Sequence, residues 1–278
     1  MKWSSFWVLL AWASVAEAQA LRIAPGTWDA QGTPCPVLRV LELEAPFGPN
    51  AVVDVPENSA AAASLLNEDS VAHALVVDDV DWTSASVGPG ETLDFQWPAL
   101  ASGTYRYHLE GLRGERLGAS GILRVGYAAE GAFRWHLSDL QSNTLDSIAG
   151  GGVPDPALYT PDFFTINEAH YPNTLEDPTA LVAVNVGDTA LISVVNAGQM
   201  DHVLHFHGFH VTLLQSSRSP ERAGWSKDSV PVRRGEGLTL QLIAHQAGTY
   251  PVHDHNLIAV TNAGFYPGGM LTQIIVSP

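Results

Sequence analysis

The sequence predicts an all-β protein built from two β-sandwich domains. Its 278 residues are 46% hydrophobic and only 15% charged, a balance that argues against long solvent-facing helices and disordered charged tails. Short apolar or alternating runs recur along the chain between Gly, Pro, Asn and Asp residues, as strands do in sandwiches. The expected strands cover residues 37–43, 71–77, 92–95, 121–125, 181–184, 191–195, 238–242 and 271–276.

An internal repeat supports the division into two domains. Two segments recur 145 residues later in the chain, 87–93 as 232–238 and 103–108 as 248–253. Upstream, segment 69–73 matches 201–205 at an offset of 132, which aligns His73 with His205. A period this long is typical of a duplicated domain rather than of a solenoid.

The Gly- and Pro-rich run at 150–156 can continue neither a helix nor a strand, and a short helical spacing precedes it at 138–149. The expected domain boundaries follow from this run. They are a first domain over 21–127, a linker over 128–158 and a second domain over 159–278.

The first twenty residues have the pattern of a secretory signal peptide. Lys2 provides a basic start, residues 3–15 form an apolar stretch, and residues 16–20 offer small residues for cleavage. We therefore expect a secreted or periplasmic protein. No later run approaches eighteen apolar residues, so no membrane anchor is expected. Thirteen basic against 29 acidic residues give a net charge of −16, which excludes nucleic acid as an expected partner.

Histidines carry the predicted chemistry. Six of the eleven fall within residues 202–210 and 253–255. Alternate residues of a strand share a face, so two pairs each present two imidazoles to one side. These pairs are His205 with His207, and His253 with His255. Imidazole suits copper, zinc, iron and nickel, so the pattern predicts a metal site. The isolated His136, His170 and His245 are expected to be surface or hydrogen-bonded side chains.

Residues 202–210, followed by 248–255, resemble the last domain of the multicopper oxidases. That family carries His-x-x-His-x-His-Gly on one strand and His-Cys-His on another. The stretch 159–167 resembles the family's domain-opening segment, and 255–258 is similar to the second domain of copper nitrite reductases. The resemblance implies two cupredoxin-like Greek-key β-sandwich domains, with copper as the cofactor.

The resemblance also implies which residues hold the metal. His73 and His205 match the type 2 copper ligands. One type 3 copper would use Glu110, His207 and His253. The other would use His108 and His255, together with a position where Leu75 cannot bind. The implied metal set is His73, His108, Glu110, His205, His207, His253 and His255.

The blue type 1 site of the family is not expected in this sequence. Asp254 stands where the family has its copper-binding cysteine, and Leu109 stands at the corresponding position of the first domain. The further ligand positions hold Ala259 and Gly264, and the single cysteine, Cys35, lies outside every motif. Without a thiolate no blue centre forms.

The function implied is a copper-binding oxidoreductase of the multicopper oxidase type, acting on oxygen or another small molecule. Two alternatives stay open: an extracytoplasmic copper-sequestering or carrier protein without turnover, and a zinc-dependent hydrolase, because three histidines and a water form many catalytic zinc sites. Both domains supply ligands, so the ligands must meet across an interface. In the similar two-domain copper enzymes this interface lies between subunits, and we therefore expect a homotrimer. The alternative is a single chain whose two domains meet face to face.

Overall fold

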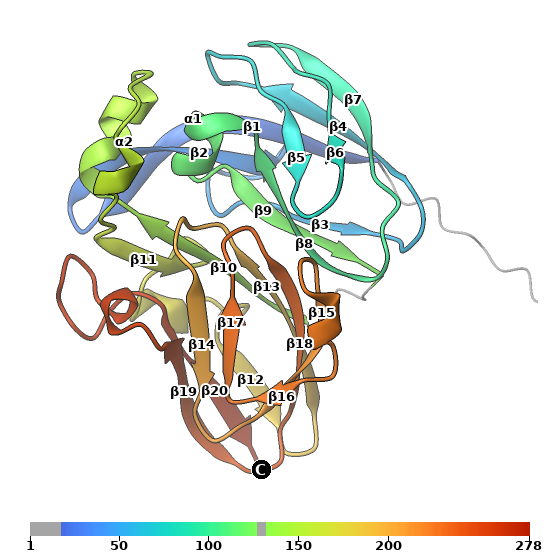
Figure 1. The fold of residues 1–278 in the computed structure, drawn as a ribbon, viewed down its shortest axis with the longest axis vertical. Helices are drawn as coiled ribbons and strands as arrows, with labels where there is room; N and C mark the ends of the chain where they lie inside the picture. Colours follow the sequence, from blue (N-terminus) through green and yellow to red (C-terminus); the bar gives the residue numbers. More distant parts are fainter. Residues whose placement is uncertain (1–17, 127–131) are drawn as a thin grey trace, which may run out of the picture.

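The computed structural model describes residues 18–126 and 132–278, so most of the expected signal peptide, residues 1–17, lies outside the described residues. Two β-sandwiches lie one above the other along the long axis of the molecule (Figure 1). The predicted all-β class is confirmed. No helix in the described ranges is both long enough and apolar enough to cross a bilayer.

The first sandwich packs a four-stranded sheet against a five-stranded sheet. The four-stranded sheet has the order β2-β1-β4-β7, formed by β1 (Gln19–Ala30), β2 (Thr33–Glu42), β4 (Ala61–Asn67) and β7 (Thr92–Trp97). The five-stranded sheet has the order β3-β9-β8-β5-β6, formed by β3 (Val52–Val55), β5 (Leu75–Val77), β6 (Trp82–Thr83), β8 (Gly103–Leu109) and β9 (Ser120–Val125). Alternate side chains of β8, including Tyr107 and Leu109, fill the core between the sheets.

The second sandwich packs a six-stranded sheet against a five-stranded sheet. The six-stranded sheet has the order β11-β10-β13-β18-β15-β16, formed by β10 (Ala132–Leu140), β11 (Phe163–Ile166), β13 (Thr189–Asn196), β15 (Val211–Ser216), β16 (Ser226–Lys227) and β18 (Gly237–Ile243). The five-stranded sheet has the order β12-β20-β19-β14-β17, formed by β12 (Val182–Asn185), β14 (His202–Phe206), β17 (Ser229–Val232), β19 (Gly248–Asp254) and β20 (Leu271–Ser277). Trp135 stacks on Phe206 at the centre of this core.

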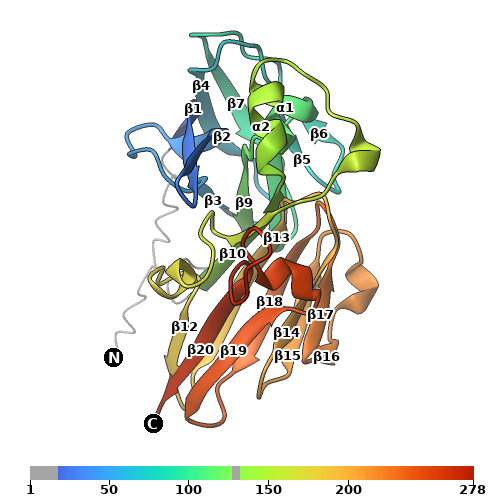
Figure 2. The same cartoon turned by 90° about the vertical axis from the view of Figure 1, so that its left-hand side faces the viewer.

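Within the segment 128–158, expected as a linker, the described residues 132–158 carry regular structure. Strand β10 pairs with β13 and so belongs to a sheet of the second sandwich. The helix expected at 138–149 forms as α2 (Ser142–Ala149), and it starts later than expected because β10 continues to Leu140. Helix α2 lies beside α1 (Gly111–Arg116) and the first sandwich, as Figure 2 shows. The short 3₁₀ turns are Pro156–Leu158, Asn173–Leu175, Pro220–Arg222 and Leu257–Val260.

Strand pairing corrects the register of the internal repeat. His73 bridges Val87, and His202 pairs with Val232, the residue that the downstream repeat matches to Val87. His73 therefore corresponds to His202, three residues before His205. The upstream offset is 129 residues rather than the 132 that the sequence match indicated.

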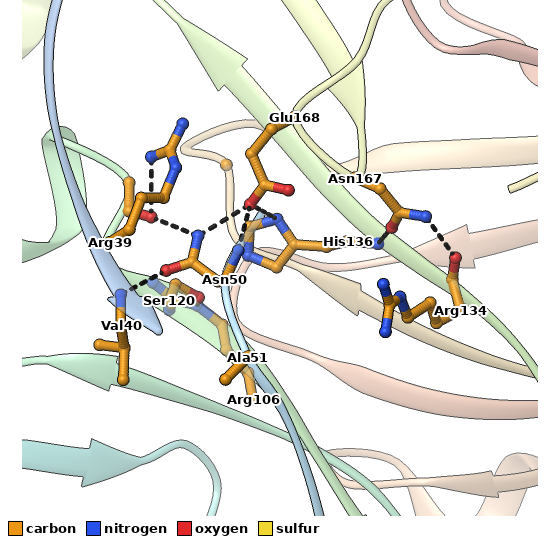
Figure 3. Close-up of polar contacts among 12 residues, drawn as sticks. Arg39, Val40, Asn50, Ala51, Arg106, Ser120, Arg134, His136, Asn167 and Glu168 are labelled. Atoms are coloured by element: carbon orange, nitrogen blue, oxygen red, sulfur yellow. Dashed lines mark hydrogen bonds and ion pairs between the residues drawn. The ribbon is translucent and has the colours of Figure 1, made fainter. Parts of the chain in front are cut away.

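The two sandwiches meet through the outer faces of two sheets, with β8 packed against β13, β15 and β18. Polar groups join them. The Thr104 and Thr239 hydroxyl oxygens lie 2.9 Å apart. The Glu168 carboxylate of the second sandwich accepts a hydrogen bond of 2.8 Å from the Asn50 side chain of the first (Figure 3). Asn167 and Glu168 both have left-handed backbone conformations, with φ of 54° and 63°, and this corner directs Glu168 into the first sandwich.

His136 lies in this polar interface and is buried, with 5% of its surface exposed. Its Nδ1 lies 3.3 Å from a carboxylate oxygen of Glu168 (Figure 3). Burial lowers the pKa of His136 to about 4, because the attraction of Glu168 offsets only part of the desolvation. The sequence indicated a surface or hydrogen-bonded residue, whereas the structure places His136 between the two domains.

Candidate metal centre

Four imidazoles gather on the outer face of the five-stranded sheet of the second sandwich. Inward-facing residues of β14 and β19, such as Leu204 and Val252, fill the core, so the alternate residues face outward. The two strands pair His205 directly with His253. The ring centroid of His205 lies 4.7 Å from that of His207 and 5.5 Å from those of His253 and His255. We call these four residues the four-histidine cluster.

Neighbouring groups fix two of these rings. The Nδ1 of His253 lies 2.8 Å from the carbonyl oxygen of Asp254 and must therefore donate its proton to it, which leaves Nε2 as the lone-pair nitrogen. The Nδ1 of His205 lies 3.0 Å from the Ser229 hydroxyl. The Nε2 atoms of His207 and His253 lie 3.1 Å apart. Metal-binding histidines commonly use one ring nitrogen for such an orienting hydrogen bond and the other for the metal.

The surroundings of His207 favour its neutral imidazole. The pKa of His207 is lowered by desolvation and by the neighbouring His205 and His253 rings. His207 and His255 are exposed, while His205 and His253 are half-buried, so the face is open to a ligand or a partner. Within residues 18–126 and 132–278, no three His, Cys, Asp or Glu side chains converge into a ready-made metal-binding group.

The predicted ligands of the first sandwich lie elsewhere. His73 is buried, and its Nε2 lies 2.8 Å from the Asp69 carboxylate, which also accepts two hydrogen bonds from Arg113. His108 donates from Nδ1 to the Leu109 carbonyl, as His253 does to that of Asp254. Glu110 is exposed directly before α1. In the described part of the chain, no contact joins these three ligands to the four-histidine cluster.

The corrected repeat identifies the counterpart of the cluster in the first sandwich. Strand β5 pairs with β8 in the first sandwich as β14 pairs with β19 in the second. Four residues of the first sandwich therefore occupy the positions of His205, His207, His253 and His255. They are Val76, Asp78, His108 and Glu110. Asp78 lies 3.5 Å from the Nε2 of His108, much as His207 lies beside His253. The first sandwich therefore keeps one imidazole of the four.

A buried ionic triad lies directly beneath the cluster. The Nδ1 of His202 lies 2.5 Å from Asp254, and its Nε2 lies 3.2 Å from Asp139, with all three side chains fully buried. Because both ring nitrogens face carboxylates, both must donate, and the ring is an imidazolium. Burial alone would lower the pKa of His202, but hydrogen bonds to the two carboxylates raise it to about 9. Sequence reasoning missed Asp139 because it lies in the segment taken as a linker.

The first sandwich holds a related but smaller arrangement. Asp69 provides the carboxylate to His73, whereas Gly198 stands at the equivalent position of the second sandwich. A Cβ at Gly198 would meet a carboxylate oxygen of Asp139 at 1.9 Å, so Asp139 fills the space left by the missing side chain. Leu109 takes the position of Asp254 and adds no charge.

The chain is similar to several known copper proteins. Residues 153–277 match the family model described as multicopper oxidase. A blue copper oxidase from Nitrosomonas europaea is 21% identical, with 92% of this chain and 85% of that chain covered and a TM-score of 0.76. A copper nitrite reductase from Nitrosomonas europaea is 17% identical, with 93% of both chains covered and a TM-score of 0.71.

A copper-containing nitrite reductase from Thermus scotoductus SA-01 is 17% identical, with 93% of this chain and 61% of that chain covered and a TM-score of 0.72. No curated protein sequence matches the chain. The expected resemblance is confirmed: residues 153–277 match the multicopper oxidase model, and the described residues share the cupredoxin-like fold of these copper proteins. Cys35 is the single cysteine of the chain.

Proposed function

We propose that the protein is a copper-binding oxidoreductase of the multicopper oxidase type, with a histidine-only copper cluster and no blue type 1 site. The observation that carries the proposal is the four-histidine cluster on one sheet face, in which the ring centroids of four pairs lie 4.7–5.5 Å apart. The similar solved structures are named as copper proteins, which favours copper over zinc. The family match and the secretory pattern together support an extracytoplasmic location.

The donor set fits copper. Four imidazoles without a carboxylate among them suit copper or zinc, whereas calcium and magnesium prefer oxygen ligands. When bound, copper would supply one-electron redox chemistry and an open coordination position for oxygen or another small molecule. The chain's own contribution is orientation: Ser229 and the Asp254 carbonyl hold the rings of His205 and His253. The lowered pKa of His207 keeps its nitrogen available to a cation at neutral pH.

His73, His108 and Glu110 stay in the proposed ligand set as residues supplied by a second chain. The four-histidine cluster lies on an open face, and these three residues belong to the other sandwich, so a homotrimer in which one chain's first domain faces the next chain's second domain would supply them. His73 and His108 are buried in this chain, so their side chains would have to be uncovered in such an assembly. For His73 to bind metal, its Nε2 would have to exchange Asp69 for the ion.

Removing a cluster histidine is expected to weaken copper binding strongly. We expect His205→Ala and His207→Ala each to lower copper affinity by more than the roughly 10–100-fold typical of losing an orienting group. His210 is exposed beyond the end of β14, and His210→Ala is the matched control with an expected change below about twofold. Chelator competition measures all three affinities. Equal losses at positions 205 and 210 would contradict the assignment.

The copper-loaded protein is expected to lack the intense thiolate-to-copper absorption of blue sites. Cys35, the single cysteine, is buried in the core of the first sandwich, where burial raises the pKa of its thiol. Visible absorption and electron paramagnetic resonance test this after metal analysis. A blue band would overturn the ligand set. Stoichiometric zinc without copper uptake would favour the hydrolase instead, and copper uptake without any turnover would favour a carrier.

Complementation tests the shared site. A His73→Ala chain co-expressed with a His205→Ala chain is expected to recover part of the copper that each variant alone loses, because a ring can pair one intact first domain with one intact second domain. Metal content per chain and the mass by light scattering are the measurements. No recovery, together with a monomeric mass, would rule out ligands shared between chains.

A further inference from the structure

We propose that the buried triad Asp139–His202–Asp254 is the positioning element of the four-histidine cluster. This inference rests on the proposed function and deepens it. The triad fixes the end of β19 against β14, and so sets the spacing at which His253 and His255 present their rings beside His205.

Asp254 lies between two cluster residues, and each of its polar groups is engaged. One carboxylate oxygen faces His202, and the other accepts the backbone N–H of Asn256 at 2.7 Å. Its carbonyl oxygen accepts the Nδ1–H of His253 at 2.8 Å. The Asp254 side chain points into the sandwich, while the neighbouring histidine rings point outward. Asp254 therefore fixes the end of β19 through its buried carboxylate and fixes the His253 ring through its carbonyl oxygen.

His202 begins β14, three residues before His205, so the triad connects the two strands that carry the cluster. Asp139 anchors it to β10 in the facing sheet. The Asp139 carboxylate accepts backbone N–H groups of Gln199 and Met200 at 3.0 Å, and also the Tyr159 hydroxyl. A shift of β19 relative to β14 would leave buried charges unpaired, and an unpaired buried charge is strongly destabilising.

The repeat supplies an internal comparison. The first sandwich has the pair Asp69–His73, but Leu109 replaces the strand carboxylate. In that sandwich only His108 remains of the four imidazoles. The complete triad and the complete cluster thus occur together in one domain, as expected if the triad serves the cluster rather than the fold alone.

Asp254→Asn in the full-length, copper-loaded protein tests the proposal. The substitution keeps the side-chain shape but removes the charge that holds His202. We expect copper(II) affinity to fall about 10–100-fold. We also expect the parallel hyperfine splitting in the electron paramagnetic resonance spectrum to change as His253 and His255 relax. Unlike affinity, this signature would not respond to a general loss of stability.

Glu236→Gln is the matched control. Glu236 is a buried carboxylate in the same domain, directly before β18. Its carboxylate pairs with Arg222 and accepts hydrogen bonds from the Ser216 hydroxyl and the backbone N–H of Arg233, and none of these three residues belongs to β19. Its loss should lower stability but leave copper affinity within about twofold and the spectrum unchanged. Tyr159→Phe removes one hydrogen bond at the far end of the triad and is expected to change the hyperfine splitting in the same direction as Asp254→Asn, by less.

The outcomes separate the two proposals. Wild-type protein that binds no copper would overturn the proposed function. Wild-type binding with unchanged affinity and spectrum in Asp254→Asn would overturn the positioning role alone, as would equal effects in Glu236→Gln. Should Asp254→Asn fail to fold, an unchanged spectrum in Tyr159→Phe would overturn it.

Discussion

Replacing His202 with leucine is expected to lower the free energy of unfolding of the metal-free protein by about 3–5 kcal/mol. The substitution removes the imidazolium that lies between Asp139 and Asp254 and leaves two fully buried carboxylates facing each other. Urea denaturation at pH 7 with a chelator present, monitored by circular dichroism, measures this loss of free energy. His210→Leu is the surface control. A loss below about 1 kcal/mol would mean that water or relaxation compensates the buried carboxylates.

The same residue predicts the alkaline limit of stability. The folded pKa of His202, about 9, is raised above the unfolded value of about 6.5. The contribution of His202 to the free energy of unfolding is therefore fully present below pH 6.5. It is lost as the pH rises through 9, and the total loss is about 3 kcal/mol. His202→Leu should remove this dependence.

Acidification is expected to destabilise the fold through His136. Its folded pKa of about 4 is depressed below the unfolded value, so its contribution is present above pH 6.5 and is lost as the pH falls to 4. The expected loss is about 3 kcal/mol. His136→Gln, neutral at every pH, should show a correspondingly flatter profile between pH 6.5 and 4 in urea denaturation. Parallel profiles for the two proteins would contradict the prediction.

Local pattern was enough to predict strands such as β9, β13 and β18, together with the cluster face. Of the strand expected at 71–77, only Leu75–Val77 forms. Alternation along β14 and β19 determines which residues point outward, so His205 and His253 could be placed on one face without knowledge of the fold. The helix near 142–149 followed equally from local spacing. The sheet membership of β10 did not, because it depends on pairing with β13, which lies more than fifty residues later.

The register of the repeat shows that matching residues in the sequence need not be structurally equivalent. Asp69 and Asp201 each precede a histidine by four residues, which produced the match at offset 132. Asp69 is buried against His73, whereas Asp201 is exposed and accepts the backbone N–H of Arg234. Identity of residues does not identify environment, and only strand pairing distinguishes the two.

The buried triad was beyond sequence reasoning for a similar reason. Asp139 and His202 are 63 residues apart, and the space for the Asp139 carboxylate exists because Gly198 lacks a side chain. Neither fact has a signature in a local pattern. The ligand-like histidines were visible from their spacing, while the groups that hold them required the packed structure.

The polar interface between the sandwiches makes each sandwich depend on the other for the burial of polar side chains. Glu168 and His136 come from one half, and Asn50 and Arg39 from the other (Figure 3). Separating the two sandwiches would expose the buried side chains of Arg39 and His136 to water. It would also leave the left-handed backbone at Asn167 and Glu168 without the contacts that it makes to the first sandwich. Grafting the four-histidine face onto another scaffold would therefore require the whole second sandwich with its interface redesigned for solvent.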